Sequence, residues 1–349
     1  RDGVAAAPRH RHAVERLVLA RGVLPAHRLA HRPVLHRAEG ARALAVGVDR
    51  PGHRLGERPG AHVLELEARR LVLDGVVEAA DRELVARELG VEDQGAVVAE
   101  PFTQWVIERR FAGARPSWEA AGALLVPDVA PYEQLKLRLL NGSHSALAYL
   151  GGLAGYTTID EAIADAELAS FVRAFMRDDV EPTLSVPVGI DVAEYEASVL
   201  DRFANPTLGY RTRQVATDGS HKLPQRLLGT IRDRRREGGQ PVFSATVVAA
   251  WLRHIAVATD DAGRPFEPDD PMLDSLRSSI DGAASSATIV DALLQVDAVF
   301  GDLVDDVWFR RTLVQLLDEL SRHRVIDVVR SLVVGGTATP TGPLDGAAL

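Results

Sequence analysis

Helical periodicity over residues 128–333 is the feature that most constrains the fold. Apolar residues recur there at the spacing of one helix face, and connectors that are polar or rich in Gly and Pro separate the segments. About 200 residues can form a domain with its own core. The predicted helices cover residues 131–141 continuing to about 151, 159–166, 168–178, 191–204, 207–217, 222–236, 243–259, 271–281, 285–297, 302–306 and 308–331. The sequence therefore predicts a mainly α fold followed by a disordered tail, residues 334–349.

Residues 80–127 have a different pattern. The stretch ADRELVARELGVED, residues 80–93, predicts an amphipathic helix. GAVVAEPFTQWVIERRF, residues 95–111, predicts a strand, a turn, and a second strand or short helix. ALLVPDV, residues 123–129, predicts a last strand, and Pro131 suits the first turn of the helix that follows.

Residues 1–93 are built from only nine residue types: Arg, Asp, Gly, Val, Ala, Pro, His, Glu and Leu. All nine have codons that begin with G or C. A GC-rich gene read in a shifted frame would give this alphabet, so we interpret residues 1–79 as a frameshifted, poorly structured segment. The alternatives are a genuine disordered or loosely helical segment, and a functional arm that binds metal or nucleic acid. Only His27 and His31 have a ligand-like spacing, and no aromatic residue is present to stack on a base.

Composition excludes several classes of function. The chain has no cysteine, which removes disulfides and thiolate chemistry, and its net charge of -9 does not favour nucleic acid or anionic membrane. No apolar run approaches the roughly 20 residues that span a bilayer, and residues 1–12 have no signal-peptide pattern. We therefore expect a cytoplasmic protein, or a fragment of one, and a monomer is compatible with the sequence.

Lysine is rare in this chain, which has 38 arginines and only two lysines. One is Lys136, five residues before Asn141 and eight before His144. A desolvated ammonium can release its proton near neutral pH, whereas a guanidinium cannot. On one helix these side chains can share a broad stripe, which would place a proton-transfer amine beside two groups that hold a substrate oxygen. The competing interpretation is structural: a snorkelling lysine, a capping asparagine and a core histidine.

The second lysine, Lys222, follows a turn within TDGSHKLP, residues 217–224. The turn would bring four polar side chains together, either as a site or as solvated tips of a helix junction: Asp218, Ser220, His221 and Lys222. A further acidic segment, EPDDP at residues 267–271, lacks the alternating ligands of a calcium loop and favours a solvated loop. We predict no metal site.

Four separated motifs resemble the polyol-specific long-chain dehydrogenases, which include mannitol 2-dehydrogenase, fructuronate reductase and tagaturonate reductase. The motifs are EPFTQWVIE (100–108), PYEQLKLRLLNGSHSALAYLG (131–151), RFANP (202–206) and DGSHKLPQR (218–226). The resemblance implies that Lys136 is the general acid/base and that Asn141 and His144 orient the reacting oxygen. It also implies a metal-independent reaction with NAD or NADP and a small sugar acid or polyol as substrate.

The same resemblance implies a substrate branch. Residues 210–226 are similar to the fructuronate reductases, with Gln214 where members that act on neutral polyols carry Arg, although Tyr210 departs from the His of that branch. A uronate carboxylate would need a cation, and Lys222 and Arg226 are the candidates. We therefore expect D-fructuronate and D-mannonate, with D-mannitol and D-fructose as the alternative pair.

The family's dinucleotide domain is not evident in this chain. No G-x-G-x-x-G lies between a predicted strand and helix, so the cofactor-binding residues are unknown, and residues 80–127 would be a remnant of the α/β Rossmann domain. Residues 128–333 would form the substrate domain, and we expect the chain as given to bind cofactor poorly and turn over slowly. A non-catalytic helical binding module is the alternative of a different class.

Overall fold

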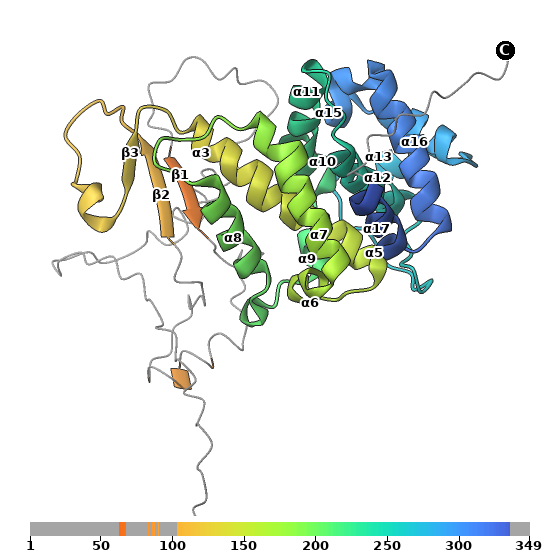
Figure 1. Cartoon of the computed structure of the whole chain (residues 1–349), viewed down its shortest axis with the longest axis horizontal. Coiled ribbons are helices and arrows are strands. Elements are labelled where there is room, and N and C mark those ends of the chain that lie inside the picture. Colours follow the sequence, from red (N-terminus) through yellow and green to blue (C-terminus); the bar gives the residue numbers. More distant parts are fainter. Residues whose placement is uncertain (1–62, 68–82, 84–85, 88–89, 91–102, 336–349) are drawn as a thin grey trace, which may run out of the picture. The chain divides into compact units, whose positions relative to one another are not determined.

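The chain forms two compact units, Arg1–Val129 and Ala130–Leu349. We analysed it as a computed structural model, which describes residues 63–67, 83, 86–87, 90 and 103–335 (Figure 1). Most of the helix predicted over residues 80–93, and the tail beyond residue 335, lie outside the described residues. The two units are described separately.

The first unit contains a three-stranded sheet in the order β1-β2-β3. β1 (Val63–Glu67) runs antiparallel to β2 (Thr103–Glu108), and β2 runs parallel to β3 (Leu124–Val126). The short helix η2 (Trp118–Ala121) precedes β3, and its Trp118 ring contacts that of Trp105 with centroids 6.1 Å apart. The strands at 103–108 and 124–126 confirm two predictions. β1 was not expected, because it lies within residues 1–79, for which the composition predicted little structure.

The second unit begins with one continuous helix from residue 130 to 154. It consists of α3 (Ala130–Leu135), η3 (Lys136–Asn141), α4 (Gly142–Ala146), η4 (Leu147–Gly151) and α5 (Gly152–Ala154). Both η3 and η4 are π-helical turns. The helix ends at Gly155, whose φ of 100° is open to glycine but strained for other residues.

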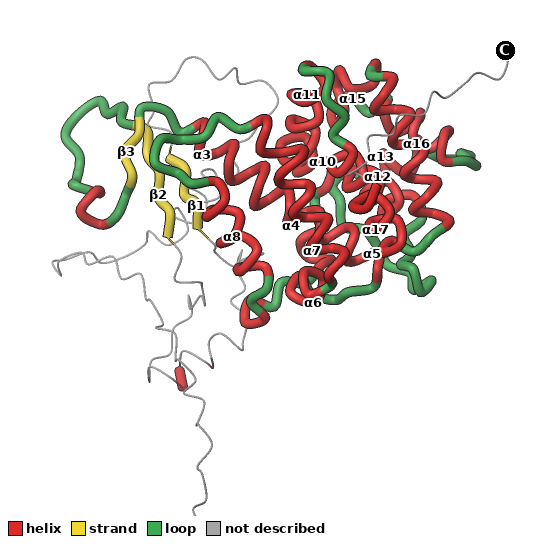
Figure 2. The backbone as a smooth tube through the Cα atoms, viewed as in Figure 1, coloured by secondary structure: helices red, strands yellow, loops and turns green. Residues whose placement is uncertain are grey.

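The rest of this unit is helical with short connections (Figure 2). In chain order the helices are α6 (Ile159–Ala164), α7 (Ala166–Ala174), η5 (Phe175–Val180), η6 (Glu181–Thr183), α8 (Val192–Phe203), η7 (Pro206–Leu208), α9 (Thr212–Val215), α10 (Gly219–Leu223), η8 (Pro224–Leu228), α11 (Gly229–Arg236), α12 (Val242–Ala256), α13 (Leu273–Ser279), α14 (Ser286–Leu294), α15 (Asp297–Phe300), η9 (Gly301–Asp305), α16 (Val307–Arg322) and α17 (Val325–Gly335). The mainly α fold predicted from periodicity is confirmed.

Local capping sets many of these boundaries. The Thr158 side chain and Glu161 form a reciprocal capping box at the start of α6, and Ser285 does the same for α14 with Thr288. Asp191 caps α8 by accepting the backbone N–H of Glu194. Such residues are visible in the sequence, which is why most helix starts were predicted closely.

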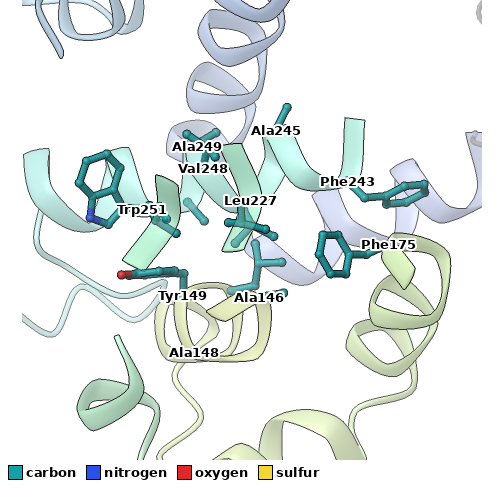
Figure 3. Packing of buried hydrophobic residues seen from close by; sticks show 14 of the residues in the cluster. Ala146, Ala148, Tyr149, Phe175, Leu227, Phe243, Ala245, Val248, Ala249 and Trp251 are labelled. Atoms are coloured by element: carbon teal, nitrogen blue, oxygen red, sulfur yellow. The ribbon is translucent and has the colours of Figure 1, made fainter. Parts of the chain in front are cut away.

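Helix α12 lies in the centre of the core. Every residue from Phe243 to Ile255 is buried, and most of them are apolar, as expected for a helix surrounded by other elements. Figure 3 shows the α12 residues Phe243, Ala245, Val248, Ala249 and Trp251 among residues from other helices: Ala146, Ala148 and Tyr149 of the 130–154 helix, Phe175 of η5 and Leu227 of η8. The helices that carry Lys136 and Arg226 therefore share one packed core with α12.

Two helix predictions were wrong in their extent. The predicted helix over residues 207–217 is interrupted after η7 by Gly209, whose φ of 57° is left-handed, and α9 begins only at Thr212. The helix predicted over residues 308–331 is divided into α16 and α17 by His323, which has an extended backbone. In the part of the chain that the structure describes, no helix is long and apolar enough to cross a bilayer.

Candidate active site

A π-helical turn sets the position of Lys136 relative to Asn141. In an α-helix, five residues advance by about 500°, roughly 140° beyond one full turn, so the two side chains would point to different faces. In η3 the hydrogen bonds join residues five apart, as in the bond from the Gly142 N–H to the Leu137 carbonyl. This places residues 136 and 141 about one turn apart. Since His144 follows three residues later on α4, all three side chains start from one side of the helix.

The Lys136 amine is half-buried and has no protein partner among the described residues. No hydrogen bond or ion pair within the described part of the chain involves it. Burial lowers its pKa most, and the positive charges of Arg226 and Arg202 lower it further, while Glu133 acts in the opposite direction. An amine in this setting exists partly in its neutral form at lower pH than an exposed lysine, which suits it to proton exchange.

The imidazole of His144 contacts two aromatic rings. Its ring centroid is 5.2 Å from that of Phe203 and 5.6 Å from that of Tyr210. The Nε2 atom is buried and makes no hydrogen bond to any described residue. Burial lowers the pKa of His144 to about 3, with Arg226 and Lys222 adding to the shift. The imidazole is therefore neutral at pH 7, and its Nε2 is available to a ligand.

Arg226 approaches the 130–154 helix closely. Its Nη1 donates a hydrogen bond of 3.1 Å to Ser145 Oγ, one residue after His144. Gly142 permits the approach, because a Cβ there would lie 3.2 Å from the Arg226 carbonyl oxygen and 3.0 Å from the Phe175 ring. Burial lowers the pKa of Arg226 to about 10, so the guanidinium stays charged at neutral pH.

The Arg226 segment is itself a π-helical turn, η8, within a helix that runs from Gly219 to Arg236. Pro224 explains the widening, since proline has no N–H to donate and its ring clashes with the carbonyl of the preceding turn. π-helical turns are rare and frequently occur at functional sites. Four occur in the described part of the chain, η3, η4, η5 and η8, and two of these carry Lys136 and Arg226.

The turn before Lys222 is anchored by the acidic loop at residues 267–271. Asp218 has a left-handed backbone, with φ of 56°, and its N–H donates to the Asp269 carbonyl at 2.9 Å. Asp270 is buried and accepts hydrogen bonds from the Ser220 hydroxyl at 2.6 Å and the Ser220 N–H at 2.8 Å. The expectation of a solvated acidic loop was wrong for Asp270, because its carboxylate satisfies buried donors of another segment.

The four polar side chains of this turn do not form one cluster. Ser220 points to Asp270, whereas Asp218 and His221 are exposed. Lys222 is half-buried; its Nζ donates to Thr217 Oγ1 at 3.0 Å and lies 3.6 Å from the Asp218 carboxylate. Burial lowers the pKa of Lys222, and Arg226 lowers it further. Lys222 and Arg226 thus act electrostatically on each other, and both act on His144.

The remaining predicted residues are less constrained by the structure. Gln214 lies half-buried on α9, and its backbone carbonyl accepts a hydrogen bond from the Thr217 hydroxyl at 3.1 Å. Asn141 is half-buried, and its side chain makes no hydrogen bond to another described residue. Sequence reasoning missed the rings of Phe203 and Tyr210 as neighbours of His144, although both belong to quoted motifs. Within the described ranges, no group of three or more His, Cys, Asp or Glu residues could hold a metal ion.

Comparison with known proteins identifies the family. Residues 128–321, more than half of the chain, match the mannitol dehydrogenase C-terminal domain. The chain belongs to the mannitol dehydrogenase family. The resemblance inferred from the four sequence motifs is therefore confirmed, and the family domain coincides with the helical unit that carries Lys136, His144 and Arg226.

Named relatives of the mannitol dehydrogenase family cover part of this chain. D-mannonate oxidoreductase of Escherichia coli (strain K12) is 43% identical over 234 residues, which is 66% of this chain and 48% of that protein. Mannitol 2-dehydrogenase of Pyrenophora tritici-repentis is 40% identical over 253 residues, or 71% of this chain and 44% of that protein. The chain spans about half the length of the curated relatives it matches.

A solved mannitol 2-dehydrogenase has a similar fold. The enzyme from Pseudomonas fluorescens, in a ternary complex with NAD and D-mannitol, superposes with a TM-score of 0.71 and 32% identity, covering 78% of this chain and 54% of that one. A D-sorbitol dehydrogenase in substrate-free form superposes with a TM-score of 0.68 and 27% identity, covering 77% and 54%.

The described residues fit the proton-transfer part of a hydride-transfer reaction, but not the binding of its cofactor. An amine with a lowered pKa, an amide and a neutral imidazole on one helix can move the proton and hold the oxygen of an alcohol. The described part of the first unit, however, contains no glycine-rich turn between a strand and a helix N-terminus, which is the usual dinucleotide-binding site of a Rossmann domain. We therefore assign no residue of this chain to cofactor binding.

Proposed function

We propose that this chain provides the substrate-binding part of an NAD(P)-dependent oxidoreductase, which interconverts a secondary alcohol and its ketone in a sugar acid or polyol. The Lys136 amine carries the proposal, because it is half-buried, has no partner among the described residues, and has a lowered pKa. A lysine kept in a chain that otherwise uses arginine supports a role in proton transfer.

In this mechanism Lys136 moves the proton. During alcohol oxidation its neutral amine takes the hydroxyl proton, and during ketone reduction its ammonium returns that proton to the developing alkoxide. A bound nicotinamide supplies the hydride chemistry. The Asn141 amide donates to the reacting oxygen, and His144, neutral at pH 7, donates from Nε2 in the matching tautomer. No metal is needed to polarise the oxygen.

The charge of the site favours an acidic sugar. Lys222 and Arg226 lie close enough to shift the pKa of His144, and either could pair with a substrate carboxylate. Gln214, in place of a further cation, would contact a hydroxyl. We therefore propose D-fructuronate and D-mannonate as the first candidates. D-fructose and D-mannitol are the second pair, supported by relatives named as mannitol dehydrogenases.

Turnover tests the role of Lys136. We expect the 349-residue chain alone to turn over slowly, so residues 103–349 are also joined to the dinucleotide domain of a family member and assayed by NADH oxidation with D-fructuronate and D-fructose. Lys136→Ala should lower kcat by about 10²- to 10⁴-fold with little change in KM. Lys222→Ala, which removes the other lysine, should mainly raise KM for D-fructuronate. A Lys136→Ala enzyme within tenfold of the parent would refute the proposed role.

A non-catalytic helical module is the alternative of another class. Calorimetric titration of the chain with D-mannonate and D-mannitol tests it without a cofactor. A binding module would have no need of a titrating amine, so its ligand affinity would be the same in Lys136→Met as in the parent. An unchanged affinity, combined with no turnover in the joined enzyme, would favour the module.

A further inference from the structure

Lys136 is surrounded by more positive than negative charge. Three charged side chains act on it: Arg226 from η8, Arg202 from α8, and Glu133 one turn earlier on its own helix. Arg226 belongs to η8, which packs against η3, the turn that carries Lys136, and of the two arginines it has the larger effect on the amine. Arg202 forms a further interaction of its own.

Arg226 keeps its charge unneutralised among the described residues. Its hydrogen bond goes to the neutral hydroxyl of Ser145, and no ion pair to a described carboxylate is formed. Other arginines nearby behave differently: Arg138 binds Asp233 at 2.6 Å, and Arg232 binds Asp302 at 2.6 Å. A half-buried guanidinium held by a neutral acceptor acts on neighbouring groups, and the Asp218 carboxylate offsets only part of its charge.

We propose that Arg226, fixed against the helix by Ser145, is a permanent cation that favours the neutral form of the Lys136 amine and so sets the pH range in which Lys136 exchanges protons. This inference rests on the proposed function and deepens it. In this proposal Arg226 acts on the reaction through the protonation of Lys136. This role is separate from any contact with a substrate carboxylate. The close approach at Gly142 is the backbone feature that allows this arrangement.

The scarcity of lysine allows a direct test. Lys136 and Lys222 are the only lysine amines in the 349-residue chain, so an amine-acylating reagent used in trace amounts reports on each by mass spectrometry of its peptide. Only the neutral amine reacts. The labelling rate measured from pH 6 to 11 therefore gives the protonation profile of Lys136 without substrate or cofactor.

Two neutral variants and two controls complete the design. Arg226→Gln keeps an N–H donor for Ser145 and removes the charge, whereas Arg226→Met keeps an apolar stem. Arg226→Lys keeps the charge. The new amine at position 226 is labelled too, but mass spectrometry distinguishes it from Lys136 because the two lie in different peptides. Arg310→Met removes an exposed arginine of α16, paired with Asp291 and without effect on Lys136.

Both neutral variants should lower the Lys136 labelling rate at pH 8 several-fold, because a smaller fraction of the amine is then neutral. Arg226→Lys and Arg310→Met should stay within about twofold of the parent. In the joined enzyme, the acid limb of the alcohol-oxidation profile should move to higher pH. Thermal unfolding identifies variants that have not folded, and either folded neutral variant is sufficient.

A folded neutral variant that labels Lys136 at the parental rate would overturn the proposal. A loss of affinity for D-mannonate without a change in the Lys136 profile would also overturn it, and would leave Arg226 as a substrate contact only. Because labelling requires no turnover, a failure of the dehydrogenase assignment would show in the kinetic assay and not here. The two proposals can thus fail independently.

Discussion

A buried carboxylate at the start of the central helix should make stability depend on pH in an unusual direction. Asp179, on η5, is 3% exposed and accepts the Ser244 N–H at 2.6 Å, in the first turn of α12. Burial raises its pKa from 3.8 to about 7, against the opposing effects of this hydrogen bond and of Arg234. The folded protein therefore holds a proton at Asp179 that the unfolded chain releases above pH 4.

The size of the effect follows from the two pKa values. A raised folded-state pKa contributes stability that is fully present below the unfolded value of 3.8 and is lost as pH rises through about 7. The shift of about three units corresponds to about 4 kcal/mol. Asp179→Asn is neutral at every pH and keeps a carbonyl oxygen for Ser244. Its free energy of unfolding, relative to the parent, should increase by up to about 4 kcal/mol between pH 4 and pH 8.

Urea unfolding of the parent and of Asp179→Asn at half-unit pH steps measures this difference. Taking the difference removes the contributions of other titrating groups, provided they do not contact Asp179. The adjacent Asp178 pairs with Arg177 at the surface, and its charge adds to the raised pKa of Asp179, so Asp178→Asn should reduce the pH-dependent loss of stability only slightly. A flat curve for Asp179→Asn, or one that falls as pH rises, would refute the reasoning.

Three further changes test other parts of the fold. Burial lowers the pKa of His254 to about 4, so it contributes stability present above the unfolded value of 6.5 and lost as pH falls toward 4; His254→Phe should remove this loss, measured as a smaller drop in Tm between pH 7 and pH 5. Gly219→Ala would drive a methyl group into the Trp251 indole, so Tm should fall by an amount equivalent to about 2 kcal/mol or more; an unchanged Tm would contradict the packing. Asp270→Ala leaves two Ser220 donors unsatisfied and should cost about 2–4 kcal/mol by urea unfolding, whereas Asp270→Asn should cost less.

The helical unit could be predicted because its signals are local. Apolar spacing gave the helices, and nearby capping residues such as Thr158 and Asp191 gave many of their starts. The role proposed for Lys136 was suggested by composition, because a lysine stands out among 38 arginines. Gly209 was also a visible signal for a helix break, but the prediction of one helix over residues 207–217 did not take it into account.

Boundaries fixed by distant residues could not be predicted. The break between α16 and α17 has no Gly or Pro, and the N–H of Val325 at the start of α17 is accepted by Asp261, 64 residues earlier. Asp179 caps α12 from 65 residues away, and Asp270 holds Ser220 from 50 residues away. Each cap depends on the tertiary fold, which no window of sequence contains.

The surroundings of the candidate site could not be predicted either, because they also depend on the tertiary fold. Lys136, Asn141 and His144 were expected to share a stripe, but a regular α-helix would have placed residue 141 on another face. The π-helical turn is a change in backbone hydrogen bonding without a residue signature at 136–141. The ring contacts of His144 with Phe203 and Tyr210 likewise join segments about 60 residues apart.

The widened turn at 136–141 means that the number of residues between Lys136 and Asn141 is not itself a chemical requirement. A π-helical turn contains one residue more than the α-helical turn it replaces, while the helix continues beyond it in nearly the same rotational phase. Removing one residue between positions 136 and 141 would leave an ordinary helix with the amine and the amide four apart, again one turn from each other. Two chains of different motif length could therefore present the same arrangement of groups to a substrate.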